Sequence, residues 1–211
     1  MEDVAELLAD AQSLMTAIDL RLADHSKHYD VLKTIQWALI EGKQVSGEYK
    51  TPYQPEAVTL TLSPIRLCLT GQAWYLIASS GKGVTPKTYR VARFQKVPAL
   101  VGHADVPKDF NVREFLGNAW TVYRGDRSYD VELEFSPAAA EVVVETKWHH
   151  TQRVESIKDG GVRLLFTVDG LDEIVWWVLG WSSRVRVIDR PELRELVLER
   201  LQRAIDLNKG D

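Results

Sequence analysis

A run of 48 residues, numbers 57–104, contains no aspartate or glutamate, although the chain as a whole has a formal net charge of −4. The run holds six basic residues, for a local charge of +6: Arg66, Lys82, Lys87, Arg90, Arg93 and Lys96. Clustered positive charge attracts anions, and the planar guanidinium of arginine presents a fork of donors that fits phosphate and carboxylate groups. We interpret this basic segment as an anion-facing surface. The alternative is a solvated basic face with no ligand.

Aromatic residues lie among these cations, most clearly in the triplet Trp74-Tyr75-Leu76. In an extended strand Trp74 and Leu76 share one face and Tyr75 lies on the other. The aliphatic neighbours of the triplet assign Trp74 to the core. Tyr75 is then the residue that can reach a ligand, and an aromatic ring beside cations is typical of surfaces that bind single-stranded nucleic acid.

Arg90 and Arg93 are separated by an odd number of positions, so a regular strand would point their side chains to opposite faces. Both can contact one ligand only if the strand bulges or ends between them, near Ala92. The sequence therefore predicts an irregularity at this point if the two arginines share a pocket.

The sequence lacks the common motifs of metal sites and phosphate-binding loops. His149 and His150 are adjacent, Cys68 is the single cysteine, and no His-x-x-x-His spacing occurs. The Gly81-Lys82-Gly83 sequence lacks the upstream glycine of a phosphate-binding loop and is typical of a hairpin turn. We predict no catalytic residue, no metal site, no cofactor and no enzymatic activity.

The composition is that of an ordinary globular protein, with 45% hydrophobic and 27% charged residues in 211. No apolar run reaches the roughly 18 residues that a membrane span needs. The acidic first residues lack the basic start of a signal peptide, and a single cysteine fits a reducing compartment. We therefore predict a cytoplasmic protein without a membrane contact.

Helical periodicity marks the first part of the chain. Apolar residues recur at three and four positions over residues 1–26, opposite an acidic face. The stripe consists of Val4, Leu7, Leu8, Ala11, Leu14, Met15, Ile18 and Leu22. A second helix is predicted over residues 29–40, ending at Gly42. The first stripe must be buried, and either a partner subunit or a further N-terminal domain would serve.

From residue 44 the period changes to two, which indicates half-buried antiparallel strands. The predicted strands are 44–49, 58–63, 73–79, 85–94 and 97–101. Five short strands with tight turns, preceded by a helix, predict a small Sm/SH3-like β-barrel, because closure removes the edges of the sheet.

Beyond the strands, residues 102–128 read as a linker with one helical turn near residues 112–116. The remaining pattern is strand 131–135, helix 137–146, strands 152–158 and 162–168, helix 171–181 and strand 184–188, which is the ferredoxin-like βαββαβ order. A final helix is predicted from Asp189-Arg190-Pro191 to residue 207. The predicted class is α+β, divided into an N-terminal helix (1–27), a barrel domain (28–101), a linker (102–128) and a ferredoxin-like domain (129–211).

These motifs resemble a known family. Residues 62–67, the Trp74-Tyr75-Leu76 triplet and residues 89–94 look like a WYL domain, and residues 129–207 resemble the WCX extension that often follows it. The WCX resemblance rests on residues 131–135, Trp148 with Gln152, residues 173–179 and residues 187–193. The likeness covers about residues 28–207.

The resemblance implies a bacterial transcriptional regulator whose Sm-like barrel senses a ligand, which in some family members is single-stranded DNA. The WCX extension would help in dimerisation and in holding the ligand. Carried over by motif, the ligand pocket would use Tyr75, Arg90 and Arg93, and charge alone adds Arg66. Many members have an aspartate where this chain has Ala92, so the carboxylate that would orient Arg93 is missing.

Most such regulators begin with a winged helix-turn-helix, and the residues before the first predicted strand are too few for one. We therefore expect operator DNA to be bound only through a domain outside this sequence. The leading hypothesis is a dimeric ligand-sensing module that binds short single-stranded DNA or RNA, or a nucleotide. The alternative is a structural module for dimerisation or partner binding, without a nucleic-acid ligand.

Overall fold

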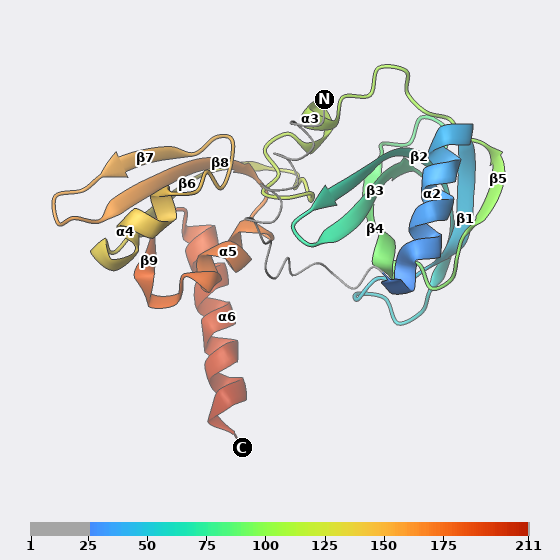
Figure 1. The fold of residues 1–211 in the computed structure, drawn as a ribbon. Coiled ribbons are helices and arrows are strands. Elements are labelled where there is room, and N and C mark those ends of the chain that lie inside the picture. The colour runs from blue at the N-terminus through green and yellow to red at the C-terminus, as the bar shows by residue number, and fades with distance from the viewer. Residues whose placement is uncertain (1–25, 211) are drawn as a thin grey trace, which may run out of the picture. The chain divides into compact units, whose positions relative to one another are not determined.

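A computed structural model describes residues 26–210, which form an α+β protein with two antiparallel sheets (Figure 1). The chain divides after Val106 into two compact units. The class and the order of elements confirm the fold predicted from periodicity. Of the helix predicted over residues 1–26, residues 1–25 lie outside the described part of the chain.

The described part of the first unit contains one α-helix and a five-stranded sheet with the order β4-β3-β2-β1-β5. Its elements are η1 (Ser26–His28), α2 (Tyr29–Glu41), β1 (Lys43–Tyr49), β2 (Val58–Thr70), β3 (Ala73–Ser79), β4 (Lys87–Arg90), η2 (Val91–Arg93) and β5 (Ala99–His103). Neighbouring strands are antiparallel throughout.

Helix α2 packs on the sheet through Val31, Ile35 and Ala38, which are all buried. It ends where the sequence predicts, because Gly42 takes a left-handed conformation (φ 61°) and donates its N–H to the carbonyl of Ala38. The core beneath the helix gathers inward-facing residues from the strands. These include Val45, Tyr49, Leu62, Leu76, Ala78, Val91 and Phe94.

The predicted barrel is not closed by a ladder of hydrogen bonds: within the described residues β4 and β5 do not pair. Strand β4 ends early, at Arg90, and the chain turns through η2 before it reaches β5. An isolated bridge between Tyr49 and Phe94 is formed instead. The sheet is therefore open between its two edge strands, because the chain leaves the sheet where closure would require β4 to continue.

The second unit has a four-stranded sheet with the order β7-β8-β6-β9, which is the ferredoxin-like order that the sequence predicts. Its elements are α3 (Val112–Leu116), β6 (Ser128–Phe135), α4 (Pro137–Val144), β7 (Arg153–Ser156), β8 (Val162–Asp169), α5 (Ile174–Gly180), η3 (Ser182–Arg184), β9 (Val185–Asp189) and α6 (Pro191–Lys209). One apolar core joins the sheet to α4, α5 and the first turn of α6.

Residues 107–127, within the expected linker, belong to the second unit and are held against it by a half-buried and a buried carboxylate. The carboxylate of Glu173 accepts hydrogen bonds from the backbone N–H groups of Thr121 (2.7 Å) and Val122 (3.2 Å). The carboxylate of Asp169 accepts from the N–H of Asn118 (3.0 Å). Trp120 packs against the core of the unit.

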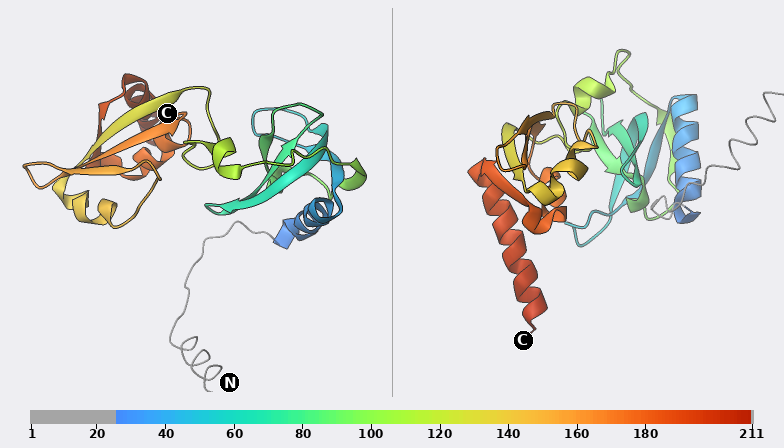
Figure 2. Two further views of the ribbon diagram at one scale, coloured as in Figure 1. Left: turned by 90° about the horizontal axis from the view of Figure 1, so that it is seen from above. Right: turned by 60° about the vertical axis from the view of Figure 1, so that its left-hand side comes forward.

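Helix α6 extends past the unit that it belongs to. Leu193 is its only buried residue among those described, and residues 201–209 are all exposed. Figure 2 shows the second half of the helix running beyond the sheet. Among the described residues, none of the helices has the length and apolar character needed to cross a bilayer.

Gly161, which follows the Asp159-Gly160 turn between β7 and β8, is closed in by backbone. A Cβ atom there would lie 2.5 Å from the carbonyl oxygen of Phe135. We expect Gly161→Ala to lower the free energy of unfolding by about 2 kcal/mol, because backbone must move to relieve the overlap. Urea unfolding measures this loss. The control is Gly180→Ala, where the added methyl meets nothing within 4 Å; equal stability of the two variants would contradict the prediction.

Candidate anion-binding face

The register of β2, β3 and β4 places three of the predicted ligand-binding residues on one face of the sheet. Tyr75 is paired with Arg90 on β4 and with Cys68 on β2. Arg66 precedes Cys68 by two positions and is paired with Ile77. Directly paired residues, and residues two apart on a strand, point to the same side of a sheet. Arg66, Tyr75 and Arg90 therefore share a face, which we call the basic face.

The other side of the same three strands faces the core. Leu67, Leu76 and Tyr89 form the adjacent row of paired residues, and all three belong to the apolar cluster under α2. Trp74 packs against that cluster and is partly buried. The alternation of the triplet thus separates a packing residue, Trp74, from Tyr75 on the opposite face, as the sequence predicts.

Arg90 combines a fixed backbone with an unused donor. Its N–H donates to the hydroxyl oxygen of Tyr49 (2.9 Å). Its side-chain Nε is buried and has no hydrogen-bond partner in the described part of the chain. Buried donors in proteins are nearly always paired, and an unpaired one costs free energy. A ligand oxygen would satisfy this guanidinium.

Arg93 lies at the end of η2, directly after the strand. Its carbonyl accepts hydrogen bonds from the N–H of Lys50 (3.1 Å) and from Nε2 of Gln95 (3.2 Å), which hold the turn against the end of β1. The strand therefore does end between Arg90 and Arg93, which is the condition that the odd spacing imposed. Both arginines act on the same group, since the charge of Arg93 also influences the Tyr49 hydroxyl.

Tyr49 connects these residues, and sequence reasoning did not select it. It is buried, with its ring edge-on to the rings of Tyr89 (5.6 Å between centroids) and Phe94 (5.2 Å). Burial raises the pKa of Tyr49, although the bond from Arg90 and the charge of Arg93 act in the opposite direction. The hydroxyl stays neutral, fixes the backbone of Arg90 and interacts with the side chain of Arg93.

Arg66 extends the basic face sideways. It is exposed on β2, two strands across and two residues along from Arg90, which corresponds to roughly 12 Å at the usual strand spacing and rise. Its charge acts on the thiol of Cys68, whose pKa is nonetheless raised because the thiol is partly buried. The structure thus gathers Tyr75, Arg90 and Arg93 around Tyr49, and it places Arg66 on the same face at a distance.

The lysines of the basic segment do not converge on this face. Lys82, Lys87 and Lys96 are all exposed, and Lys96 lies 3.6 Å from Glu48 of the neighbouring strand β1. A carboxylate from outside the segment therefore offsets part of the positive charge that the sequence assigns to it. The arginines, and not the total charge, define the candidate site.

His149 and His150 have structural partners in the second unit. The ring of His149 is stacked on Trp120, and its nitrogens are 2.8 Å from Thr151 Oγ1 and 3.2 Å from the carbonyl of Ala119. Burial lowers the pKa of His149. Within residues 26–210 no group of three or more potential metal ligands is found.

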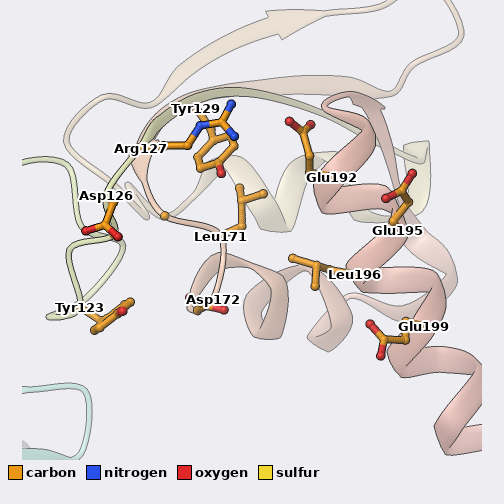
Figure 3. A pocket seen from close by; sticks show the side chains of 12 residues that line it. Tyr123, Asp126, Arg127, Tyr129, Leu171, Asp172, Glu192, Glu195, Leu196 and Glu199 are labelled. Atoms are coloured by element: carbon orange, nitrogen blue, oxygen red, sulfur yellow. The ribbon is translucent and has the colours of Figure 1, made fainter.

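A cavity of about 510 Å³ in the second unit has the opposite electrostatic character (Figure 3). Its carboxylates are Asp126, Asp172, Glu192, Glu195 and Glu199. Arg127 is the one basic side chain in the lining, and its guanidinium lies 5.3 Å from the ring centre of Tyr129. An anion would be repelled here, so this cavity is not a candidate for the anion site.

Comparison with known proteins divides the chain in the same way. Residues 30–99 match the model of the WYL domain, and residues 127–205 match that of the WCX domain. A search of curated proteins found no match.

Two solved structures are similar to the chain. Proteasome accessory factor B/C of Arthrobacter aurescens is 21% identical with a TM-score of 0.38, and the match covers 82% of this chain and 26% of that one. A CRISPR Cas-related protein is 11% identical with a TM-score of 0.51, over 85% of this chain and 51% of that one. The second likeness supports the fold. The chain spans about a quarter of the first protein and half of the second.

Proposed function

Because the chain belongs to the family of WYL-domain proteins with a WCX extension, we propose that it is the ligand-sensing module of a bacterial transcriptional regulator. The ligand is a short single-stranded DNA or RNA, or a nucleotide, bound on the basic face. Binding is relayed through a dimer of the chain to the regulated function. The module has no catalytic activity of its own.

The single observation that carries the ligand class is the unpaired, buried Nε of Arg90 beside Tyr75. Phosphate oxygens accept hydrogen bonds from a guanidinium in paired geometry, and an aromatic ring offers a surface on which a base can stack. Arg93 lies next to the same point and Arg66 lies further along the face. This arrangement suits an extended ligand with more than one phosphate.

Dimerisation is supported by α6. Leu198, Leu201 and Ile205 lie at helical spacing and are exposed, so they form an apolar stripe with no partner in the described part of the chain. The same stripe favours the second candidate function, a structural dimerisation module without a nucleic-acid ligand. The two candidates differ only in whether the basic face binds a ligand.

Salt dependence of oligonucleotide binding tests the proposal. Fluorescence anisotropy with a labelled single-stranded oligonucleotide is expected to show binding that weakens steeply between two salt concentrations, because each phosphate contact releases counterions. A neutral-backbone oligonucleotide of the same sequence is the control and should not bind. Absence of binding to DNA, RNA and nucleotides would favour the structural candidate. Binding that is equal at both salt concentrations would contradict recognition through phosphate contacts on the basic face.

A further inference from the structure

A hollow of about 580 Å³ in the second unit is walled mainly by tryptophan, and we call it the tryptophan hollow. Four of the seven tryptophans of the chain line it, together with residues at the end of α5 and in η3. The four are Trp148, Trp176, Trp177 and Trp181. The hollow shares no residue with the acidic cavity of Figure 3, and its volume lies in the range of small-ligand sites, about 300–1,000 Å³.

The tryptophan rings meet at steep angles and keep part of their surface exposed. The ring of Trp181 stands at 87° to that of Trp148 and at 73° to that of Trp177, with centroids 5.9 Å and 6.0 Å apart. These three side chains are half-buried, and Trp176 is 63% exposed. An aromatic ligand can stack on one such wall while its edge meets the next, and both arrangements are favoured between aromatic rings. The walls therefore suit a flat aromatic group.

Two donors at this wall lack an acceptor. Nε1 of Trp177 is buried and has no hydrogen-bond partner in the described part of the chain, whereas Nε1 of Trp148 donates to the carbonyl of Val143 (2.8 Å). Nη1 of Arg200 is likewise buried and unpaired, and the guanidinium lies 4.5 Å from the ring centre of Trp176. Both atoms are covered by neighbouring side chains, so they act on a ligand through their field. That field favours a ligand with acceptors or negative charge.

The rim of the hollow after α5 combines backbone strain with exposed donors. Ser182 has a φ of 54°, in the left-handed region that costs an L-residue roughly 1–2 kcal/mol. Strain of this kind persists where the surrounding structure holds it, and it concentrates at functional sites. The exposed side chains of Ser183 and Arg184 also line the hollow, and none of its described lining residues is acidic. The rim thus offers a hydroxyl and a guanidinium to an anion.

We propose that the tryptophan hollow binds a small planar aromatic ligand that carries one anionic group. The ring stacks on the tryptophan walls, and the anionic group accepts hydrogen bonds from Arg184 and Ser183. Phosphate and carboxylate both match the fork of a guanidinium, so a nucleoside monophosphate and an aromatic carboxylate share this chemistry. A cation, the other common partner of tryptophan rings, is disfavoured by the charges of Arg184 and Arg200. The site does not depend on the basic face or on the function proposed above.

Isothermal titration calorimetry of the full chain tests the ligand class. Adenosine 5′-monophosphate and phenylacetate each combine an aromatic ring with an anion, and at least one of them is expected to bind. Adenosine lacks the anion and ribose 5-phosphate lacks the ring, so each control should bind about 10- to 100-fold more weakly. Binding of the nucleotide alone, or of the carboxylate alone, identifies the source of the ligand. Absence of binding by both at millimolar concentration, or equal binding of either control, would overturn the proposal.

Gly180→Leu locates the bound ligand. Gly180 lines the hollow, and a Cβ atom there meets nothing within 4 Å, so the leucine side chain should fill the hollow without disturbing the core. We expect Gly180→Leu to weaken binding at least about tenfold and to keep the thermal midpoint, with Gly180→Ala as the matched control of nearly unchanged affinity. Arg90→Ala should leave this binding intact. Loss of binding in Arg90→Ala but not in Gly180→Leu would place the ligand on the basic face and overturn the proposal for the hollow.

A charge substitution provides a test that does not depend on filling the hollow. Arg184→Gln removes an exposed guanidinium from the rim and is expected to weaken binding of the aromatic anion about 10- to 100-fold. Arg153→Gln removes the same charge from an exposed position on β7 that does not line the hollow, and it should change the affinity little. Equal affinities of the two variants would refute recognition of the anion at this rim.

Discussion

Replacing Arg90 by alanine is expected to weaken binding of a single-stranded oligonucleotide by about 10- to 100-fold, since a hydrogen bond to a charged group contributes about 1.5–3 kcal/mol and each 1.4 kcal/mol is a factor of ten. The guanidinium is the group with an unpaired buried donor on the basic face. Anisotropy titrations of the variant and the unmodified protein at one salt concentration measure the ratio.

The control for this substitution is Lys82→Ala, which removes the same charge from the same acid-free segment. Lys82 is exposed in the loop between β3 and β4, away from the face that holds Tyr75. Its loss should leave affinity nearly unchanged. Arg90→Lys keeps the charge but not the fork of donors, so we expect an intermediate affinity. If Arg90→Ala and Lys82→Ala bind equally well, the basic face acts through net charge alone and the proposed pocket is wrong.

Asp169→Ala should lower the free energy of unfolding of the second unit by about 1–2 kcal/mol, because it leaves part-buried donors without an acceptor. Asp169 is buried at the end of β8. It accepts from the N–H of Asn118 and from Nε of Arg124, both at 3.0 Å. Chemical unfolding measures the loss. Asp172→Ala, which removes an exposed carboxylate three positions away, should have little effect.

The stabilising effect of Asp169 should also depend on pH. Burial would raise its pKa, but the bonds from Asn118, Ser128 and Arg124 outweigh burial and hold the pKa below the ordinary value. A carboxyl with a lowered folded-state pKa stabilises the fold above its unfolded-state pKa, and the contribution is lost as the pH falls through the folded value. The stability advantage over Asp169→Asn should therefore shrink below about pH 4. An advantage that grows on acidification would refute this assignment.

Local pattern was sufficient for most of the fold. Alternation located the strands and placed Tyr75 opposite Trp74, and helical spacing located α2 with its stop at Gly42. The order of elements was enough to predict the ferredoxin-like sheet, because that order restricts the possible topologies. Short-range periodicity predicts the elements and their orientation, since each face of a helix or strand is either buried in the core or exposed to solvent.

Long-range contacts explain what the sequence could not show. Closure of the barrel was expected, but β4 ends at Arg90. The hydroxyl of Tyr49 accepts from the N–H of Arg90, and the N–H of Lys50 donates to the carbonyl of Arg93, so residues some forty positions earlier hold the turn. Similarly, Glu173 binds the backbone of residues 121 and 122 from a distant part of the chain. No local pattern records such pairings, so neither the role of Tyr49 nor the docking of residues 117–125 was predicted.

The length of α6 beyond its own unit has a consequence for local stability. Its last turns are held by side-chain pairs such as Arg203 with Glu199 and Gln202 with Asp206, each worth only about 0.2–0.5 kcal/mol. In an isolated chain the amide hydrogens of residues 201–209 should exchange rapidly, while those near the buried Leu193 exchange slowly. Slowed amide exchange at the end of α6 would therefore show that the helix has acquired a packing partner. The measurement needs no label and identifies the residues that are covered.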